Sequence, residues 1–246
     1  VHHRKEWFGL LPPDADSTVL AEVAANTAET LNECVFDMIY LGALDGEDIL
    51  GGSENSWHYG SKFVFEIANR LKKPALFEMS TFHHHLWYVR ARMGAWDHPN
   101  RSHKEFIDAH AAANLAGASM FLPMNLGWWA VKVWTGPRNE PTFPDDIEYL
   151  LAKCIGTDAG LSLMGVHPGN IDTIPAYQRL APIFERYEAL RHAAYFPQAV
   201  KDQLKQAGAE FTLRDGADGK PVFKRVHYAK HKVCDTQGFT LSLIHI

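Results

Sequence analysis

Apolar residues along the chain alternate between helix-like spacing and short continuous runs. From Val19 to Leu31 they recur about every four residues, which predicts a helix over 18–33. The run over 35–41 is short, β-branched and aromatic, as expected of a buried strand. The same contrast predicts helices over 58–72, 102–117, from 142 onward and over 174–191, and strands over 74–79, 119–122 and 161–166.

The order of these elements predicts an α/β fold. Strand and helix repeat as consecutive units, which favours a parallel sheet with helices packed outside it. No glycine-rich G-x-G-x-x-G loop follows any strand, and this disfavours an open, nucleotide-binding sheet. We therefore expect residues 1–197 to form the C-terminal half of a TIM-type (β/α)8 barrel, with the other strands upstream of Val1.

The pattern changes after residue 197. A short helix over 198–206 is followed by two strand-like segments, 210–214 and 222–232, around a loop that contains Gly216 and Gly219. This spacing predicts a hairpin. We expect 198–240 to begin a β-rich accessory domain. The last six residues, 241–246, match the translation of a sequencing adapter and are interpreted as non-native, the alternative being a genuine apolar strand.

Composition narrows the choice of partner. With 46% hydrophobic and 22% charged residues, the chain is typical of a globular protein. A net charge of -5 and scattered basic residues argue against nucleic acid, and no apolar stretch is long enough to predict a membrane span. No cofactor motif was found. Secretion suits an enzyme acting on polysaccharides, and a leader would then lie upstream of Val1.

Two acids stand where barrel enzymes carry their catalytic groups. Asp45 follows the end of the first predicted strand, and Glu78 ends the second. Cleavage of a glycosidic bond needs two carboxylates, one as proton donor and the other as nucleophile or base. The sequence therefore predicts a catalytic pair, with Asp97 in reserve for either role and Asp48 as a substrate contact. The alternative is a solvated acidic loop near Asp45 and a buried, ion-paired Glu78.

Aromatic, histidine and arginine residues gather after the same strands. Such side chains suit a sugar site, since rings stack on pyranose faces while Arg and His donate hydrogen bonds. Taken singly, each is more often a core or surface residue. The expected substrate contacts are Trp57, His83, His85, Trp87, Arg90, Arg92, Trp96, Trp128, Trp129 and His167. One of the adjacent pair Trp128 and Trp129 is expected to pack into the fold.

Three adjacent histidines, His83 to His85, leave a metal-dependent hydrolase open as an alternative. Neighbouring side chains diverge, and no His-x-His or His-Glu-x-x-His spacing is present, so no metal ligands are assigned. A Gly-x-Ser-x-Gly elbow is also missing from the sequence, which disfavours a serine nucleophile. A non-catalytic carbohydrate-binding barrel is the remaining alternative.

Short motifs between residues 35 and 100 resemble a known group of enzymes. They are Phe36–Leu41 before an Asp-Gly loop, the strand ending in Glu78, and Arg92-x-Gly94-x-Trp96-Asp97. This combination resembles the retaining barrel glycosidases related to α-galactosidases and endo-α-N-acetylgalactosaminidases. The resemblance implies that a strand-end Asp, here Asp45, is the nucleophile, and that an acid on a later strand is the acid/base. It also implies a β domain after the barrel.

Overall fold

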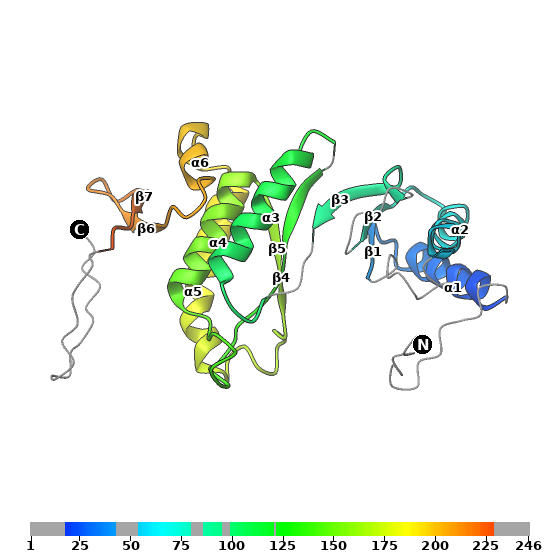
Figure 1. Cartoon of the computed structure of the whole chain (residues 1–246), viewed down its shortest axis with the longest axis horizontal. Coiled ribbons are helices and arrows are strands. Elements are labelled where there is room, and N and C mark those ends of the chain that lie inside the picture. Colours follow the sequence, from blue (N-terminus) through cyan, green and yellow to red (C-terminus); the bar gives the residue numbers. More distant parts are fainter. Residues whose placement is uncertain (1–17, 43–53, 80–85, 95–98, 121, 229–246) are drawn as a thin grey trace. The chain divides into compact units, whose positions relative to one another are not determined.

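The computed structural model describes residues 18–42, 54–79, 86–94, 99–120 and 122–228. The chain divides into two compact units (Figure 1). The first comprises Val1–Ala95 with Ala118–Leu122, and the second Trp96–Gly117 with Pro123–Ile246. Each unit has its own hydrophobic core. The two are therefore described separately.

The first unit has a small parallel sheet. Strand β1 pairs with β2, and β2 pairs with β3, in both cases in parallel. Helices α1 and α2 pack against each other. The elements are α1 (Val19–Glu33), β1 (Met38–Leu41), α2 (Ser56–Ala68), β2 (Leu76–Met79) and β3 (Arg90–Gly94). The two predicted helices and two predicted strands up to residue 79 are confirmed, with ends that differ by a few residues.

The core of the first unit lies between its helices and one face of its sheet. Phe77 and Met79 of β2 pack there against Ala24 and Leu31 of α1 and Val64 of α2. Further members are Ala28, Ile67 and Leu86, with Ile39 and Leu41 partly buried at the edge. Because strand side chains alternate between faces, the residues between these core positions belong to the opposite face.

The connection from β2 to β3 corrects one expectation. Candidate binding residues were expected to follow β2 with no strand predicted among them, but 90–94 form a strand. The described part of the connection is a turn in which Leu86 enters the core and Tyr88 stacks on Phe65 of α2, with ring centroids 5.6 Å apart. The signal was missed because Arg90 and Arg92 interrupt the apolar pattern that marks a buried strand.

The second unit contains the remaining helices and strands. Strands β4 and β5 are parallel, and β6 and β7 form an antiparallel hairpin. The elements are α3 (His103–Gly117), β4 (Leu122–Ala130), α4 (Pro144–Thr157), β5 (Gly160–Met164), α5 (Pro175–His192), α6 (Gln198–Leu204), β6 (Phe211–Asp215) and β7 (Pro221–Arg225). Only the first residue of β4 is assigned to the other unit.

Strand β4 is longer and later than predicted. The expected strand over 119–122 is wrong, since β4 runs from Leu122 to Ala130. A shift in register between Asn125 and Trp128 accommodates Gly127, whose φ is +118°. The Asn125 side chain supports the irregularity: its Oδ1 accepts from the Gly127 N–H (2.9 Å), and its Nδ2 donates to Ser162 Oγ (2.8 Å). Asn125 and Gly127 interrupt the apolar pattern, and the strand was therefore not recognised from the sequence.

Helices α3 and α4 begin at different kinds of cap. At α4, Pro144 occupies the first turn and the Asp146 carboxylate accepts the Phe143 N–H at 2.9 Å. At α3, the Ser102 N–H donates to Glu140 Oε2 at 2.8 Å, so a distant acid supplies the acceptor.

Two contiguous cores hold the second unit together. Trp129 and Leu126 of β4 pack with Ile107 of α3 and Leu150 of α4. The other core joins α4, α5 and α6 to the hairpin, through residues that include Ile147, Leu180, Leu204, Phe211 and Leu213. Residues 198–225 therefore share a core with the helices that precede them, and a domain boundary at 198 stays a prediction.

The described residues form an α/β fold with parallel strand pairs in both units, as the alternation of elements predicted. Within these residues no pairing of strands closes a barrel. The α/β fold class is confirmed, and the barrel stays a prediction.

Candidate functional site

The strongest candidate site lies at the carboxyl end of β2. Glu78 is the last but one residue of this strand and is 2% exposed. Its neighbours Phe77 and Met79 face the helices, so alternation directs Glu78 to the other face of the sheet. Tyr40 of β1 is its partner in the parallel register. A carboxylate is thus withdrawn from solvent on the face opposite α1 and α2.

Two residues of the neighbouring strands share the register of Glu78. Arg92 of β3 is paired with Glu78 in the backbone register, although its side chain lies outside the described part. Tyr40, Glu78 and Arg92 are therefore neighbours in the register of the three strands.

Arg90 is placed differently from its prediction. It was expected to reach a substrate from a loop, but it belongs to β3 and is 6% exposed. Its Nη2 donates to the backbone carbonyl of Met79, at the end of β2. A guanidinium bound to the backbone in this way stabilises the carboxyl end of the strand that carries Glu78.

The tryptophans separate into exposed and core residues. Trp57, in the first turn of α2, is 52% exposed, and Trp87, in the turn before β3, is 62% exposed. Trp87 contacts Tyr88 edge to face, next to the stack of Tyr88 on Phe65. Tyr88 therefore connects this turn to α2, and Trp87 lies beside Tyr88 with most of its surface exposed.

Trp129 is a core residue. It is 3% exposed, and its indole Nε1 donates to the carbonyl of Leu126 at 3.0 Å. It packs against Ile107 and Leu150, so the structure gives no support to its expected contact with substrate. The expectation that one of the adjacent pair packs into the fold is confirmed. The side chain of Trp128 lies outside the described part.

His167 is exposed in the turn that follows β5. Its Nδ1 accepts from the Gly169 N–H at 3.2 Å, so the proton of the neutral imidazole belongs on Nε2. Asn170 holds the turn, because its Oδ1 accepts the His167 N–H (3.0 Å) and its Nδ2 donates to the Gly165 carbonyl (2.6 Å). His167 is therefore an oriented hydrogen-bond donor at a strand end.

Several predicted residues lie outside the described part of the chain. They are Asp45, Asp48, His83, His85, Trp96 and Asp97. The pairing of Asp45 with Glu78 stays a prediction for this reason. Among the described residues there is no group of three His, Cys, Asp or Glu side chains that could hold a metal ion. The same described residues include no helix long and apolar enough to cross a membrane.

Sequence reasoning missed Trp134, which is 68% exposed in the loop after β4. The predicted strand ended at residue 122, so the region after its true end at Ala130 was not considered as a strand-end loop. The signal available was the apolar run that resumes after Gly127 and continues to Val131.

A polar cluster in the second unit was also missed. Asp108 of α3 accepts from Tyr149 of α4 (2.6 Å) and from the Gly208 N–H (2.7 Å). Lys153, 1% exposed, lies 3.4 Å from Asp108, donates to the Gln206 carbonyl and has its ammonium 4.8 Å from the centre of the Tyr149 ring. Burial lowers the pKa of Lys153, and burial beside Asp108 raises the pKa of Tyr149.

Another group of charges lies one turn earlier on the same helices. Lys104 contacts Asp145 (2.8 Å) and Glu210 (2.7 Å), and the Tyr228 hydroxyl donates to Glu210. Although burial works against its charge, the two carboxylates raise the pKa of Lys104. Burial and the bond to Glu210 raise the pKa of Tyr228 to about 12. These contacts attach the segment before β6 to α3 and α4.

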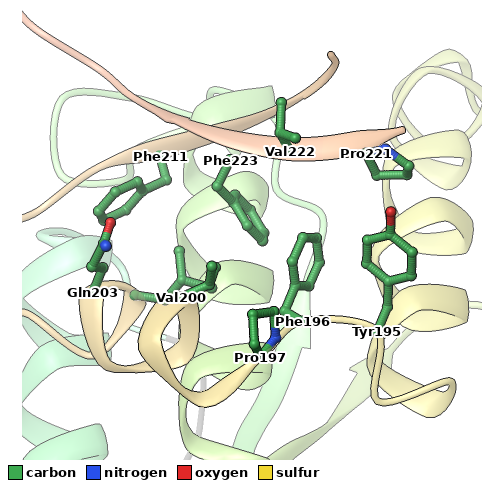
Figure 2. Close-up of a pocket in the computed structure, with 10 residues that line it drawn as sticks. Tyr195, Phe196, Pro197, Val200, Gln203, Phe211, Pro221, Val222 and Phe223 are labelled. Carbon is green, nitrogen blue, oxygen red and sulfur yellow. The ribbon is translucent and has the colours of Figure 1, made fainter. Parts of the chain in front are cut away.

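The second unit also has an apolar cavity of about 330 Å³ between α6 and the β6–β7 hairpin (Figure 2). Phe196 and Phe223 point toward one another there, with ring centroids 4.7 Å apart. The polar side chains of its lining are those of Tyr195 and Gln203, and no acid contributes. This cavity lacks the groups needed for bond cleavage and contains none of the predicted site residues.

Comparison of the sequence with models of protein families gave no match, and comparison with curated proteins gave none at a significant level. The function is therefore inferred from the positions and contacts of the described residues.

Proposed function

We propose that the chain is the later half of a (β/α)8-barrel enzyme that hydrolyses glycosidic bonds, with Glu78 as the proton donor. One observation carries the proposal: Glu78 is buried at the carboxyl end of a parallel strand, on the sheet face opposite the helices. In barrel enzymes that end of the sheet holds the catalytic groups.

The placement of the helices supports a barrel over an open sheet. In the first unit α1 and α2 pack on the same face, the face of Phe77 and Met79. A doubly wound sheet places helices on both faces, whereas a barrel has them outside only. On the barrel hypothesis the face of Glu78 is the interior, and further strands upstream of Val1 complete it.

The second carboxylate of the proposal is Asp45, with Asp97 in reserve. Glu78 protonates the leaving oxygen while Asp45 attacks the anomeric carbon, and Glu78 then takes a proton from the water that releases the sugar. This retaining order follows from the resemblance to α-galactosidase-like enzymes. It requires the two carboxyl groups to lie about 5 to 5.5 Å apart, whereas about 6.5 to 9.5 Å would correspond to inversion.

The test replaces Glu78 by Gln in the extended protein, meaning the reading frame continued upstream of Val1 to the whole barrel. Hydrolysis of a panel of aryl glycosides is measured. We expect Glu78→Gln to lower kcat/KM, which reports the first step, by about 10²- to 10⁴-fold for poor leaving groups, because general acid catalysis contributes that much. The loss should shrink for dinitrophenyl glycosides, whose leaving group needs no proton.

Glu29→Gln is the matched control, since Glu29 is an exposed acid on α1 of the same unit. The two variants remove the same charge and add the same amide. Equal activity of Glu78→Gln and Glu29→Gln on every substrate would overturn the assignment. Stoichiometric zinc in the purified extended protein would favour the metal-dependent alternative instead.

A further inference from the structure

The carboxyl ends of β4 and β5 form a second edge, within the second unit alone. Ala130 and Met164, the last residues of the two strands, are paired in the parallel register. The loops over 131–143 and 165–174 therefore leave the sheet side by side. In α/β proteins, ligands bind outside the carboxyl ends of parallel strands.

The loop after β4 is fixed by hydrogen bonds. Lys132 and Thr142 exchange two of them, from the Lys132 N–H to Thr142 Oγ1 and from the Thr142 N–H to the Lys132 carbonyl, both 2.9 Å. Lys132 Nζ also donates to the Pro99 carbonyl at 2.8 Å and to Asn100 Oδ1 at 2.9 Å. A well-anchored loop thus presents Trp134, whose side chain is 68% exposed.

The loop after β5 presents a different group. Its imidazole, His167, is oriented by Gly169 and carries its neutral-state proton on Nε2. The Gly165 carbonyl, which begins this loop, accepts from both Asn170 Nδ2 (2.6 Å) and the Tyr177 hydroxyl (3.1 Å). Gly165 has a φ of +70°, so the sharp turn itself depends on glycine.

We propose that Trp134 and His167 form a carbohydrate-binding site at this edge. The indole face covers the apolar face of a pyranose, and His167 Nε2–H donates to one of its hydroxyls. The His167 ring is oriented before the ligand arrives, which lowers the entropic cost of binding. Asn170 and Tyr177 act as positioning residues for His167. The identity of the ligand as a sugar rests on the proposed function.

The test titrates free hexoses and N-acetylhexosamines into the extended protein and follows binding by calorimetry. We expect Trp134→Ala to weaken the affinity about tenfold, because loss of a stacked ring costs roughly that much. Trp134→Phe should keep part of the affinity. Val133→Ala is the control: Val133 is 61% exposed in the same loop but has no ring. His167→Gln, which keeps a donor, should bind better than His167→Ala.

The outcomes separate this site from catalysis at Glu78. If hydrolysis depends on Glu78 while Trp134→Ala binds and turns over like Val133→Ala, the site is wrong and the proposed function stands. If Trp134→Ala loses binding while Glu78→Gln keeps full activity, the site stands and the catalytic assignment falls. A wild-type protein that binds none of these sugars overturns the site.

Discussion

Two buried ionisable side chains in this molecule have contrasting positions. Lys153 lies between elements, with Asp108 from α3, the Tyr149 ring from α4 and the Gln206 carbonyl from the segment before β6 around it. Glu78 lies on a strand, at the carboxyl end of a parallel sheet and on the face opposite the helices. Both side chains are almost wholly removed from solvent.

The difference shows how a structural charge and a catalytic candidate can be told apart. A buried charge is tolerated when a counter-charge and hydrogen bonds surround it, and its role is then to join the elements that supply them. At Lys153 those elements are the helices α3 and α4 and the segment before β6. At Glu78 the position itself is informative, because strand ends of α/β folds are where ligands bind.

The largest expected effect is on the solubility and activity of the chain made alone, and it depends on the sheet face that carries Glu78. If that face is a barrel interior, the 246-residue chain made alone exposes apolar surface and open strand edges. We expect it to be inactive and poorly soluble, and the extended protein to be soluble. Expression yield, gel filtration and glycosidase assays measure this. A monomeric chain that unfolds cooperatively by itself would count heavily against the half barrel.

At Lys153 the expected effect is on the free energy of unfolding and not on activity. Asp108→Asn removes the counter-charge of Lys153, and stranding a buried charge costs about 3 to 5 kcal/mol. The free energy of unfolding should fall accordingly in urea titrations of the extended protein followed by circular dichroism. Glycosidase activity per folded molecule should not change.

A second variant sharpens the interpretation of this loss. Asp108→Asn combined with Lys153→Met should be more stable than Asp108→Asn alone, because no unpaired ammonium is left in the interior. Asp172→Asn is the control, since Asp172 is exposed in the same unit. If Asp108→Asn unfolds like Asp172→Asn, the cluster does not hold the hairpin segment in place.

The smallest expected effect is at the cap of α4. Burial works against the charge of Asp146, but the bond from His103, the Phe143 N–H and the charge of Lys104 together lower its pKa below 3.8. Its contribution is therefore present above pH 3.8 and is lost as the pH falls through the lowered value. We expect Asp146→Asn to cost about 1 kcal/mol at neutral pH.

The pH dependence supplies the check on this prediction. Thermal unfolding of wild type and Asp146→Asn should differ at pH 6 and converge as the pH falls through the lowered pKa of Asp146. A constant difference from pH 6 to pH 2 would show that the ionised carboxylate is not what stabilises the cap.

The sequence predicted the helices and most strands because their apolar spacing is regular. Helices α1, α2 and α5 begin and end within a few residues of their predicted bounds. The failures share a cause: β3 contains two arginines, and β4 contains Asn125 and Gly127 within its run. Polar residues inside a strand are stabilised by contacts distant in sequence, such as the bond from Asn125 to Ser162, which local patterns do not contain.

The candidate site was only partly accessible to the same reasoning. Glu78 was found because it ends a clear strand, and Trp134 was missed because the end of its strand was misplaced. Trp129 and Arg90 were assigned to substrate by residue type, while their burial depends on packing and on the Met79 carbonyl. Residue type indicates what a side chain can do, and tertiary contacts decide whether it is available.

The short connection between β2 and β3 has a consequence for the order of folding. Phe77 and Arg90 pair across a loop roughly one third as long as that between Met38 and Leu76. The entropic contribution to the free energy of closing this loop is therefore about 1 kcal/mol smaller. The β2–β3 pair should therefore form early, before β1 joins. The strand that carries Glu78 would then be the template on which the rest of its sheet assembles.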